Sequence, residues 1–176
     1  MKKSVLKGLK SDTKPKTGAI VEGLKGSPLF RKAVTRKMRH NRLFSLWFMV
    51  RQMIVDTCAL DTVEKREAFA DRIMVMANYG FVTIYEIVAD DGTLLGIIGT
   101  LPETNMFTSE KSLSIVCLIC YARVTNDVLK SGLEKIVADA KKLKCDSITG
   151  STENKQVVSI MQKCGFKTSI VGIKGL

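Results

Sequence analysis

The sequence predicts a mixed α/β fold with helices packed over a sheet, and two patterns support this prediction. Residues 28–79 have apolar side chains three and four positions apart, whereas residues 81–124 are rich in β-branched and aromatic residues. The rest of the chain alternates helix and strand, which is typical of a right-handed parallel βαβ unit. With 176 residues, 45% of them apolar and 26% charged, the chain fits one globular domain with an appendage.

Three helices are expected before the sheet. Each starts at a residue type that caps helices and continues with apolar residues at helical spacing. In the second, Phe44, Phe48, Met49 and Met53 widen the apolar stripe, which predicts burial on more than one side. The expected helices are 28–38, with Ser27 as N-cap and Pro28 first; 42–57, capped by Asn41; and 62–79, started by Asp61 and Glu64 and ended by Gly80.

The sheet is expected to begin with a hairpin, because Asp90-Asp91-Gly92 is a turn signal between two β-branched runs. The strand after it is apolar on both faces in its middle, which predicts a central position. The expected strands are 81–89, 93–101, 112–124, 146–152 and 166–174, with a polar loop at 102–111 and helices at 127–144 and 154–164.

One hydrophobic cluster is expected to join the helices and the sheet. Its members occupy inner positions of the helices and strands. They are Trp47, Phe69, Ile73, Ile115, Leu133, Ile136, Ile160 and Phe166.

Positive charge is concentrated at the start of the chain. Residues 1–42 hold 13 of the 28 Lys and Arg residues but only two of the 17 acidic residues, so the net charge of +11 lies there and residues 43–176 are neutral. Large apolar residues are also scarce at the start, which predicts an extended segment. We therefore expect a basic arm at residues 1–25 and a folded domain at residues 26–176.

A basic arm on a neutral body predicts a polyanionic partner, which can be nucleic acid, an anionic membrane surface or an acidic protein face. We expect the chain to join a larger complex through this arm; the alternative is a solubilising tail. A second basic run lies between two expected helices. It can bind phosphates, or it can simply be the solvated end of a helix. The candidate polyanion-binding residues are Lys2, Lys3, Lys7, Lys10, Lys14 and Lys16 in the arm and Arg36, Lys37, Arg39 and Arg42 in the second run.

A metal site and secretion are not expected. The five cysteines lack the spacing of a disulfide framework, which favours a reducing compartment. Cys117 and Cys120 have the spacing of half a zinc site, but in a strand they point to opposite faces, and His40 is the only histidine. No apolar run approaches the roughly 18 residues of a membrane span, and no apolar segment follows the basic start as in a secretory signal.

The C-terminal half of the chain has an ordered series of local motifs. Ala140-Lys141-Lys142-Leu143-Lys144-Cys145 is followed by Thr152-Glu153-Asn154 and then by Gln162-Lys163-Cys164-Gly165-Phe166. Together with the hairpin and the long strand, these motifs resemble the GNAT family of N-acetyltransferases. The resemblance implies a GNAT-like fold over residues 28–174, with acetyl-CoA at the loop before the helix 127–144.

This loop departs from the family pattern. In the family, backbone N–H groups of a glycine-rich loop bind the pyrophosphate of acetyl-CoA at the start of the following helix. Residues 123–132 have no Gly-x-Gly, and Asp127 adds negative charge. We therefore expect no cofactor, with acetyl-CoA as the alternative. If acyl-CoA binds, the resemblance implies contacts from Val124, Asn126, Val128, Lys130 and Ser131.

Catalytic residues do not carry over either. Many family members have a tyrosine four residues before the Gly-Phe pair, where it protonates the departing thiolate, but this chain has Met161. Glu86, or Tyr121 through water, is a candidate base for the acceptor amine. Both are residue types common on a sheet rim, and we expect no catalytic residue.

Three functions stay open from sequence alone. The leading hypothesis is a non-catalytic GNAT-like structural or interaction protein that uses the basic arm; it is similar to small GNAT-like proteins of tailed bacteriophages, some of which are virion components. The alternatives are an active acetyl-CoA-dependent N-acetyltransferase and a nucleic-acid-binding accessory protein. The expected location is the host cytoplasm or the virion.

Overall fold

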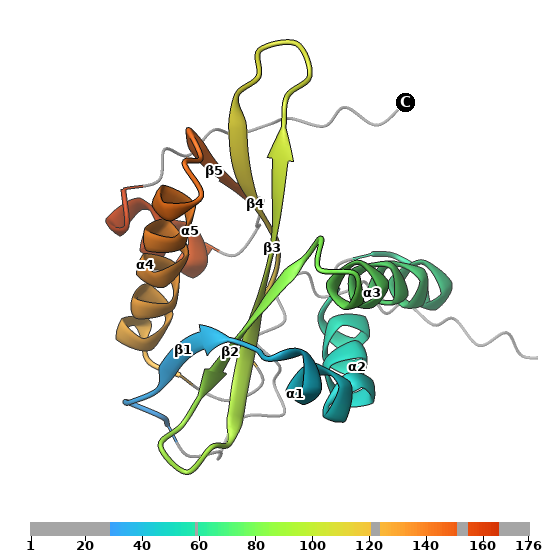
Figure 1. Ribbon diagram of the computed structural model, residues 1–176. Coiled ribbons are helices and arrows are strands. Elements are labelled where there is room, and N and C mark those ends of the chain that lie inside the picture. Colours follow the sequence, from blue (N-terminus) through green and yellow to red (C-terminus); the bar gives the residue numbers. More distant parts are fainter. Residues whose placement is uncertain (1–28, 59, 121–123, 151–154, 166–176) are drawn as a thin grey trace, which may run out of the picture.

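A five-stranded mixed sheet forms the centre of the fold (Figure 1). The computed structural model describes residues 29–58, 60–120, 124–150 and 155–165. The strands lie in chain order from β1 to β5; the first four pair antiparallel, and β4 and β5 pair parallel. The predicted mixed α/β fold is confirmed. The predicted arm 1–25 and final strand 166–174 lie outside the described residues.

The predicted helix 28–38 is wrong. Its described part is extended and contains β1 (Val34–Lys37), which pairs with β2 (Thr83–Val88) in a register that runs from Val34↔Val88 to Lys37↔Tyr85. The β-branched pair Val34–Thr35 suits a strand. Pairing with β2 supplies backbone hydrogen bonds that the local helix-start signal does not anticipate.

The chain before β1 contacts the start of α4 (Asn126–Lys142). Phe30 forms a parallel bridge with Val124, and its carbonyl accepts a hydrogen bond from the N–H of Thr125 at 3.2 Å. Phe30 therefore joins the start of the described chain to the residue that precedes the crossover helix.

Three helices cover one face of the sheet: α1 (His40–Ser45), α2 (Trp47–Thr57) and α3 (Val63–Asn78). The predicted helix 42–57 is divided at Leu46, whose N–H donates to the carbonyl oxygens of Arg42 and Leu43 in a tight turn. None of the helices in the described ranges is long and apolar enough to cross a membrane.

Two predicted helix caps need correction. Arg39, not Asn41, is the N-cap of α1, and the Asn41 side chain accepts a hydrogen bond from the N–H of Arg42 instead. At α3, the side chain of Thr62 accepts from the N–H of Lys65 and caps the helix. Asp61, the predicted cap, pairs with the Lys65 ammonium.

The predicted hairpin around Asp90-Asp91-Gly92 is confirmed. β2, β3 (Leu94–Thr104) and β4 (Lys111–Cys120) form two consecutive hairpins. β3 and β4 extend into what was expected to be a polar loop and end in the projecting turn at the top of Figure 1. In this turn Met106 and Phe107 are almost fully exposed.

The predicted parallel βαβ unit is confirmed. It consists of β4, α4 (Asn126–Lys142) and β5 (Ser147–Gly150). α4 lies on the face of the sheet opposite α1–α3, and α5 (Lys155–Lys163) packs beside it (Figure 1).

The sheet separates two main cores, so the prediction of one cluster is wrong. The core under α1–α3 includes Ile54, Ile73 and Ile97, and the core under α4 includes Leu113 and Ile136. A sheet covered on both faces buries side chains on both, because successive residues of a strand point to opposite faces.

Most predicted core residues are nevertheless inside. Ile73, Leu133, Ile136 and Ile160 are buried, whereas Trp47, Phe69 and Ile115 are half-buried at the margins of the cores. Phe166 lies outside the described residues.

Candidate functional site

The first turn of α4 is where the family resemblance implies acetyl-CoA contacts. Asp127 is exposed there, as are Asn126, Lys130 and Ser131, whereas Val124 is half-buried beside Phe30 and Val128 is buried against the sheet. Lys130 is 3.7 Å from the carboxylate of Glu134. Apart from the two valines, the implied contact residues therefore share an accessible helix end.

The N-cap of α4 has an unusual polar atom. Thr125 occupies this position but makes no side-chain capping bond. Its Oγ1 is buried and has no hydrogen-bond partner within the described part of the chain.

The pairing of β4 with β5 stops halfway along β4. The register runs from Ser112↔Ser147 to Ile115↔Gly150. Beyond Ile115, β4 continues for five residues toward α4, and β5 provides no partner for them in the described ranges. An unpaired strand edge offers backbone N–H and C=O groups to an extended ligand.

A small hollow of about 260 Å³ lies beside the first turn of α4. Its charged lining consists of Arg31, Lys32, Asp90 and Asp127. Two positive and two negative side chains cancel, so the hollow has no net charge with which to attract a pyrophosphate.

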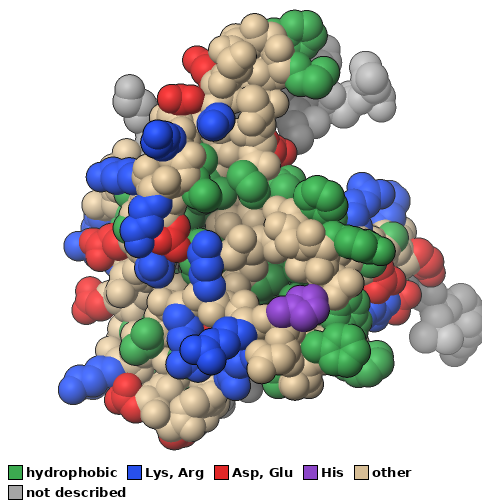
Figure 2. All heavy atoms as spheres, viewed as in Figure 1, with side chains coloured by type: hydrophobic (Ala, Val, Ile, Leu, Met, Phe, Trp, Pro, Cys, Tyr) green, Lys and Arg blue, Asp and Glu red, His purple; other side chains and the backbone are tan. Residues whose placement is uncertain are grey.

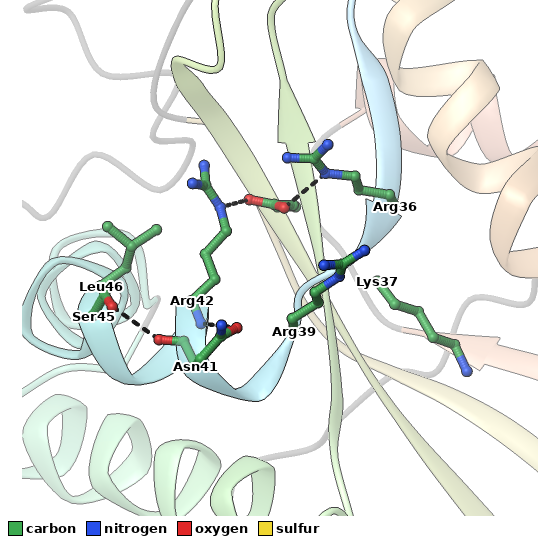
Figure 3. Close-up of a pocket in the computed structure, with 8 residues that line it drawn as sticks. Arg36, Lys37, Arg39, Asn41, Arg42, Ser45 and Leu46 are labelled. Atoms are coloured by element: carbon green, nitrogen blue, oxygen red, sulfur yellow. Dashed lines mark hydrogen bonds and ion pairs between the residues drawn. The ribbon is translucent and has the colours of Figure 1, made fainter.

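A larger hollow of about 490 Å³ lies where β1, β2 and α1 meet (Figure 3). We call it the basic hollow, and it is lined by Arg36, Lys37, Arg39, Asn41, Arg42, Ser45, Leu46 and Glu86. The side chains of Arg36, Arg39 and Arg42 outnumber the one carboxylate that faces the hollow, so the hollow has a net positive charge, which favours an anionic ligand.

Glu86 lies at the floor of the basic hollow and not on an open sheet rim as expected. It is only 1% exposed. Arg36, its direct neighbour on β1, donates from Nε to Oε1 at 2.9 Å, and Arg42 from α1 donates from Nε to Oε2. Arg42 also donates from Nη2 to the carbonyl of Gly92 at 3.3 Å. Each carboxylate oxygen is thus bound by one arginine, and both arginines are held in place.

The structure brings together three of the predicted polyanion-binding residues. The side chains of Arg36, Arg39 and Arg42 converge on the basic hollow, whereas Lys37 points away from it (Figure 3). The Lys37 ammonium lies 5.9 Å from the ring centroid of Tyr85. Arg39 has no ion pair with any residue that the structure describes. The six candidate lysines of the arm lie outside the described residues.

Sequence analysis missed the exposure of two aromatic residues next to the basic hollow. Phe44 is 72% exposed and Phe48 is 84% exposed, although the wide apolar stripe predicted their burial; of the four residues that widen this stripe, only Met53 is buried. On a helical projection, Phe44 and Phe48 lie on the same side as the polar residues Asn41 and Ser45. This pattern could have predicted that the two rings are exposed.

No metal centre is present in the described ranges, where no three His, Cys, Asp or Glu side chains gather. Cys117 is largely buried, and this burial raises the pKa of its thiol to about 12. The same effect raises the pKa of Cys120 to about 12. Both thiols are protonated at neutral pH and are therefore poor nucleophiles and metal ligands.

Comparison with known proteins gives structural neighbours only. No protein-family model matches the chain, and no curated protein sequence does. Among solved structures, glucosamine-6-phosphate N-acetyltransferase from Arabidopsis thaliana is 15% identical with a TM-score of 0.59, covering 83% of this chain and 99% of its own. A GNAT family acetyltransferase from Staphylococcus aureus is 15% identical with a TM-score of 0.51, covering 82% and 98%. An acetyltransferase from Clostridium acetobutylicum, described as predicted and solved with acetyl-CoA, is 12% identical with a TM-score of 0.57, covering 82% and 96%.

These neighbours show that the chain has a GNAT-like fold. At these identities the likeness shows the fold alone, so activity must be argued from the side chains.

Proposed function

We propose that the chain is a non-catalytic GNAT-fold interaction protein that binds a polyanionic partner through the basic residues of its first quarter. The observation on which this proposal depends is the engagement of Glu86, the candidate base, by both Arg36 and Arg42. A general base needs an oxygen within reach of the substrate proton. A buried carboxylate with both oxygens bound to guanidinium groups is instead suited to orienting those groups.

The other catalytic position supports the same proposal. Met161 is buried between α4 and α5 with Leu133 and Ile160. A buried thioether fills core volume and has no proton to give to a thiolate. Asp127 in the first turn of α4 opposes a pyrophosphate there.

Sequence resemblance to small GNAT-like proteins of tailed bacteriophages suggests a setting for this function. In that setting, we propose that the chain is a component of a virion. Its basic segment binds either packaged nucleic acid or an acidic face of a neighbouring protein. Isolation of intact particles followed by mass spectrometry tests this setting; absence of the chain from purified particles contradicts it.

The basic segment is tested by replacing Lys2, Lys3, Lys7, Lys10, Lys14 and Lys16 with Gln in the full chain. Each phosphate neutralised on duplex DNA contributes about −0.9 to the slope of log affinity against log salt concentration. If all six lysines engage phosphates, the variant loses about five units of that slope and most of its affinity near 100 mM salt. A truncated chain that begins at Gly26 is expected to stay folded and to lose the same binding. An unchanged salt slope in both proteins contradicts the proposal.

A second candidate function, acetyl-CoA-dependent N-acetyl transfer, is favoured by one specific observation. Beyond Ile115, β4 has no β5 partner among the described residues, and this part of the strand leads toward the N-cap of α4. Calorimetric titration with acetyl-CoA separates the two candidates. The first proposal expects no saturable heat, whereas a micromolar Kd that is lost on substitution of residues 125–131 establishes the second.

A further inference from the structure

We propose that the folded body has its own binding surface for single-stranded nucleic acid, made of Arg36, Arg39, Arg42, Phe44 and Phe48. We call this set the α1 surface. The proposal rests on the proposed function, because it specifies the polyanion and places part of its binding on the domain. Phosphates occupy the basic hollow and bases stack on the two phenylalanine rings.

The two phenylalanine side chains are exposed on either side of the turn at Leu46. Phe44 belongs to α1 and Phe48 to the first turn of α2. The N–H of Leu46 donates to the carbonyls of Arg42 at 3.0 Å and Leu43 at 3.2 Å, and the N–H of Val50 donates to the carbonyl of Leu46 at 2.9 Å. Both rings are strongly exposed and form apolar surface that the described residues leave uncovered. Nucleobases stack on such rings regardless of sequence.

The cations beside these rings are arranged for phosphate. Arg36 and Arg42 use their Nε atoms on Glu86, which holds both guanidinium groups at the wall of the basic hollow. Arg39 points into the same space and is free of ion pairs within the described residues (Figure 3). Planar guanidinium groups bind phosphate oxygens in a bidentate manner, and preorganisation lowers the entropy lost on binding.

Basic and hydrophobic side chains gather on the same face of the molecule. In Figure 2 the single histidine, His40, lies between a group of Lys and Arg side chains and a group of hydrophobic side chains. These groups cover β1 and the α1–α2 region, respectively. A strand of nucleic acid can therefore place its backbone on the first group and its bases on the second.

This combination favours a single strand over a duplex or a membrane. A duplex buries the faces of its bases in its own stack, so Phe44 and Phe48 would gain nothing from it. A lipid surface also gains from the rings and the cations, but it is flat, whereas Arg39 and Arg42 surround a hollow with Glu86 at its floor. A single strand uses both parts.

The test uses the full chain and fluorescence anisotropy with a labelled 20-nucleotide oligo(dT) and with a duplex of equal length. The double variant Phe44→Ala/Phe48→Ala is expected to weaken binding to the single strand by about tenfold or more, the size of one or two lost stacking contacts. Binding to the duplex should change by less than about twofold, and the salt slope should stay the same. Arg39→Gln should weaken binding to the single strand and lower its salt slope by about 0.7.

Matched controls separate this surface from general effects. Met106→Ala/Phe107→Ala removes equally exposed apolar side chains at the distant hairpin turn and should leave affinity unchanged. Phe48→Trp retains an aromatic ring and should retain affinity. Circular dichroism verifies that each variant is folded, which is expected because Phe44 and Phe48 contribute little to either core.

Four outcomes overturn the proposal. The first is an unchanged affinity of the double phenylalanine variant for the single strand. If the six-lysine variant loses binding in the same experiment, the proposed function still holds, but the α1 surface has no part in it. An equal loss of duplex binding excludes base stacking. Binding of the wild-type chain, but not the double variant, to phosphatidylserine vesicles with no loss of oligo(dT) affinity assigns the rings to a membrane. If the wild-type chain binds neither oligo(dT), duplex nor heparin, the proposed function also fails.

Discussion

Tyr85 on β2 and Asp139 on α4 are joined by a buried hydrogen bond between the sheet and its crossover helix. The phenol donates to Oδ2 at 3.0 Å, and the Lys135 ammonium donates to Oδ1 at 3.1 Å. Burial raises the pKa of Tyr85 above its ordinary value, and the hydrogen bond to Asp139 raises it further. This contact anchors α4 to the sheet without exposing either group to solvent.

Asp139 should make stability depend on acid pH. Burial acts to raise its pKa, but hydrogen bonds from Lys135 and Tyr85 outweigh burial and lower the pKa below 3.8. The stabilisation is therefore fully present above the pKa of the unfolded chain, about 3.9, and is lost as pH falls through the lower folded value. In urea denaturation, the difference between wild type and Asp139→Asn should be constant from pH 5 to 7 and shrink below pH 4. Asp90→Asn, at an exposed site, serves as control; a difference that stays constant to pH 2.5 contradicts the assignment.

Ile136 tests the packing of α4 on the sheet. It is completely buried in the core formed with Tyr85, Ile98 and Leu113. Ile136→Ala should lower the free energy of unfolding by about 2–5 kcal/mol, measured as a shift of the denaturant midpoint. Leu143→Ala, at a half-exposed position after the same helix, should cost less than about 1 kcal/mol. If the two substitutions have equal effects, the face of α4 that contains Ile136 is not buried against the sheet.

Glu86 is expected to stabilise the folded protein. Glu86→Gln removes the charge that Arg36 and Arg42 bind and should lower the free energy of unfolding by about 1–3 kcal/mol. Both arginines reach solvent, which keeps the cost below that of a fully buried ion pair. Thermal denaturation measures the effect, with the exposed Glu67→Gln as control. A variant as stable as wild type would show that the two ion pairs contribute nothing.

Gly96 should tolerate no side chain. A Cβ atom at this position on β3 would lie 2.5 Å from the carbonyl oxygen of Ile119 and 3.2 Å from Cα of Cys120. Both are backbone atoms of β4, so Gly96→Ala must displace the neighbouring strand, at a cost of about 1–3 kcal/mol or more. At Gly132 the nearest atoms belong to the side chains of Thr35 and Ile98 and can shift. Gly132→Ala should therefore be the milder change in a parallel denaturation experiment.

The sheet from β2 to β5 was predictable because its signals are local. Alternating β-branched residues and the Asp-Asp-Gly turn define the first hairpin, and helical periodicity defines α4. β1 was missed because the only favourable local signal, Val34–Thr35, is short. Its stability depends on β2, which lies about 50 residues further along the chain.

The candidate site was only partly predictable for the same reason. The basic run containing Arg36, Arg39 and Arg42 was visible as composition, but its convergence on Glu86 requires β1 and α1 to meet β2. Whether Phe44 and Phe48 are exposed depends on which other elements pack against their helices. The periodicity of apolar residues does not give this information. The departure of the loop before α4 from a glycine-rich pattern could be recognised without a structure, because Asp127 and the missing glycines are features of the sequence itself.

The contact of Phe30 with the start of α4 has a mechanical consequence. Its carbonyl is hydrogen-bonded to the N–H of Thr125, and its backbone bridges Val124. Tension applied to the chain upstream of Phe30 is therefore transmitted to the first turn of α4 before it reaches β1. Phe30 is thus the residue through which a force on the start of the chain would act on the crossover helix as well as on the sheet.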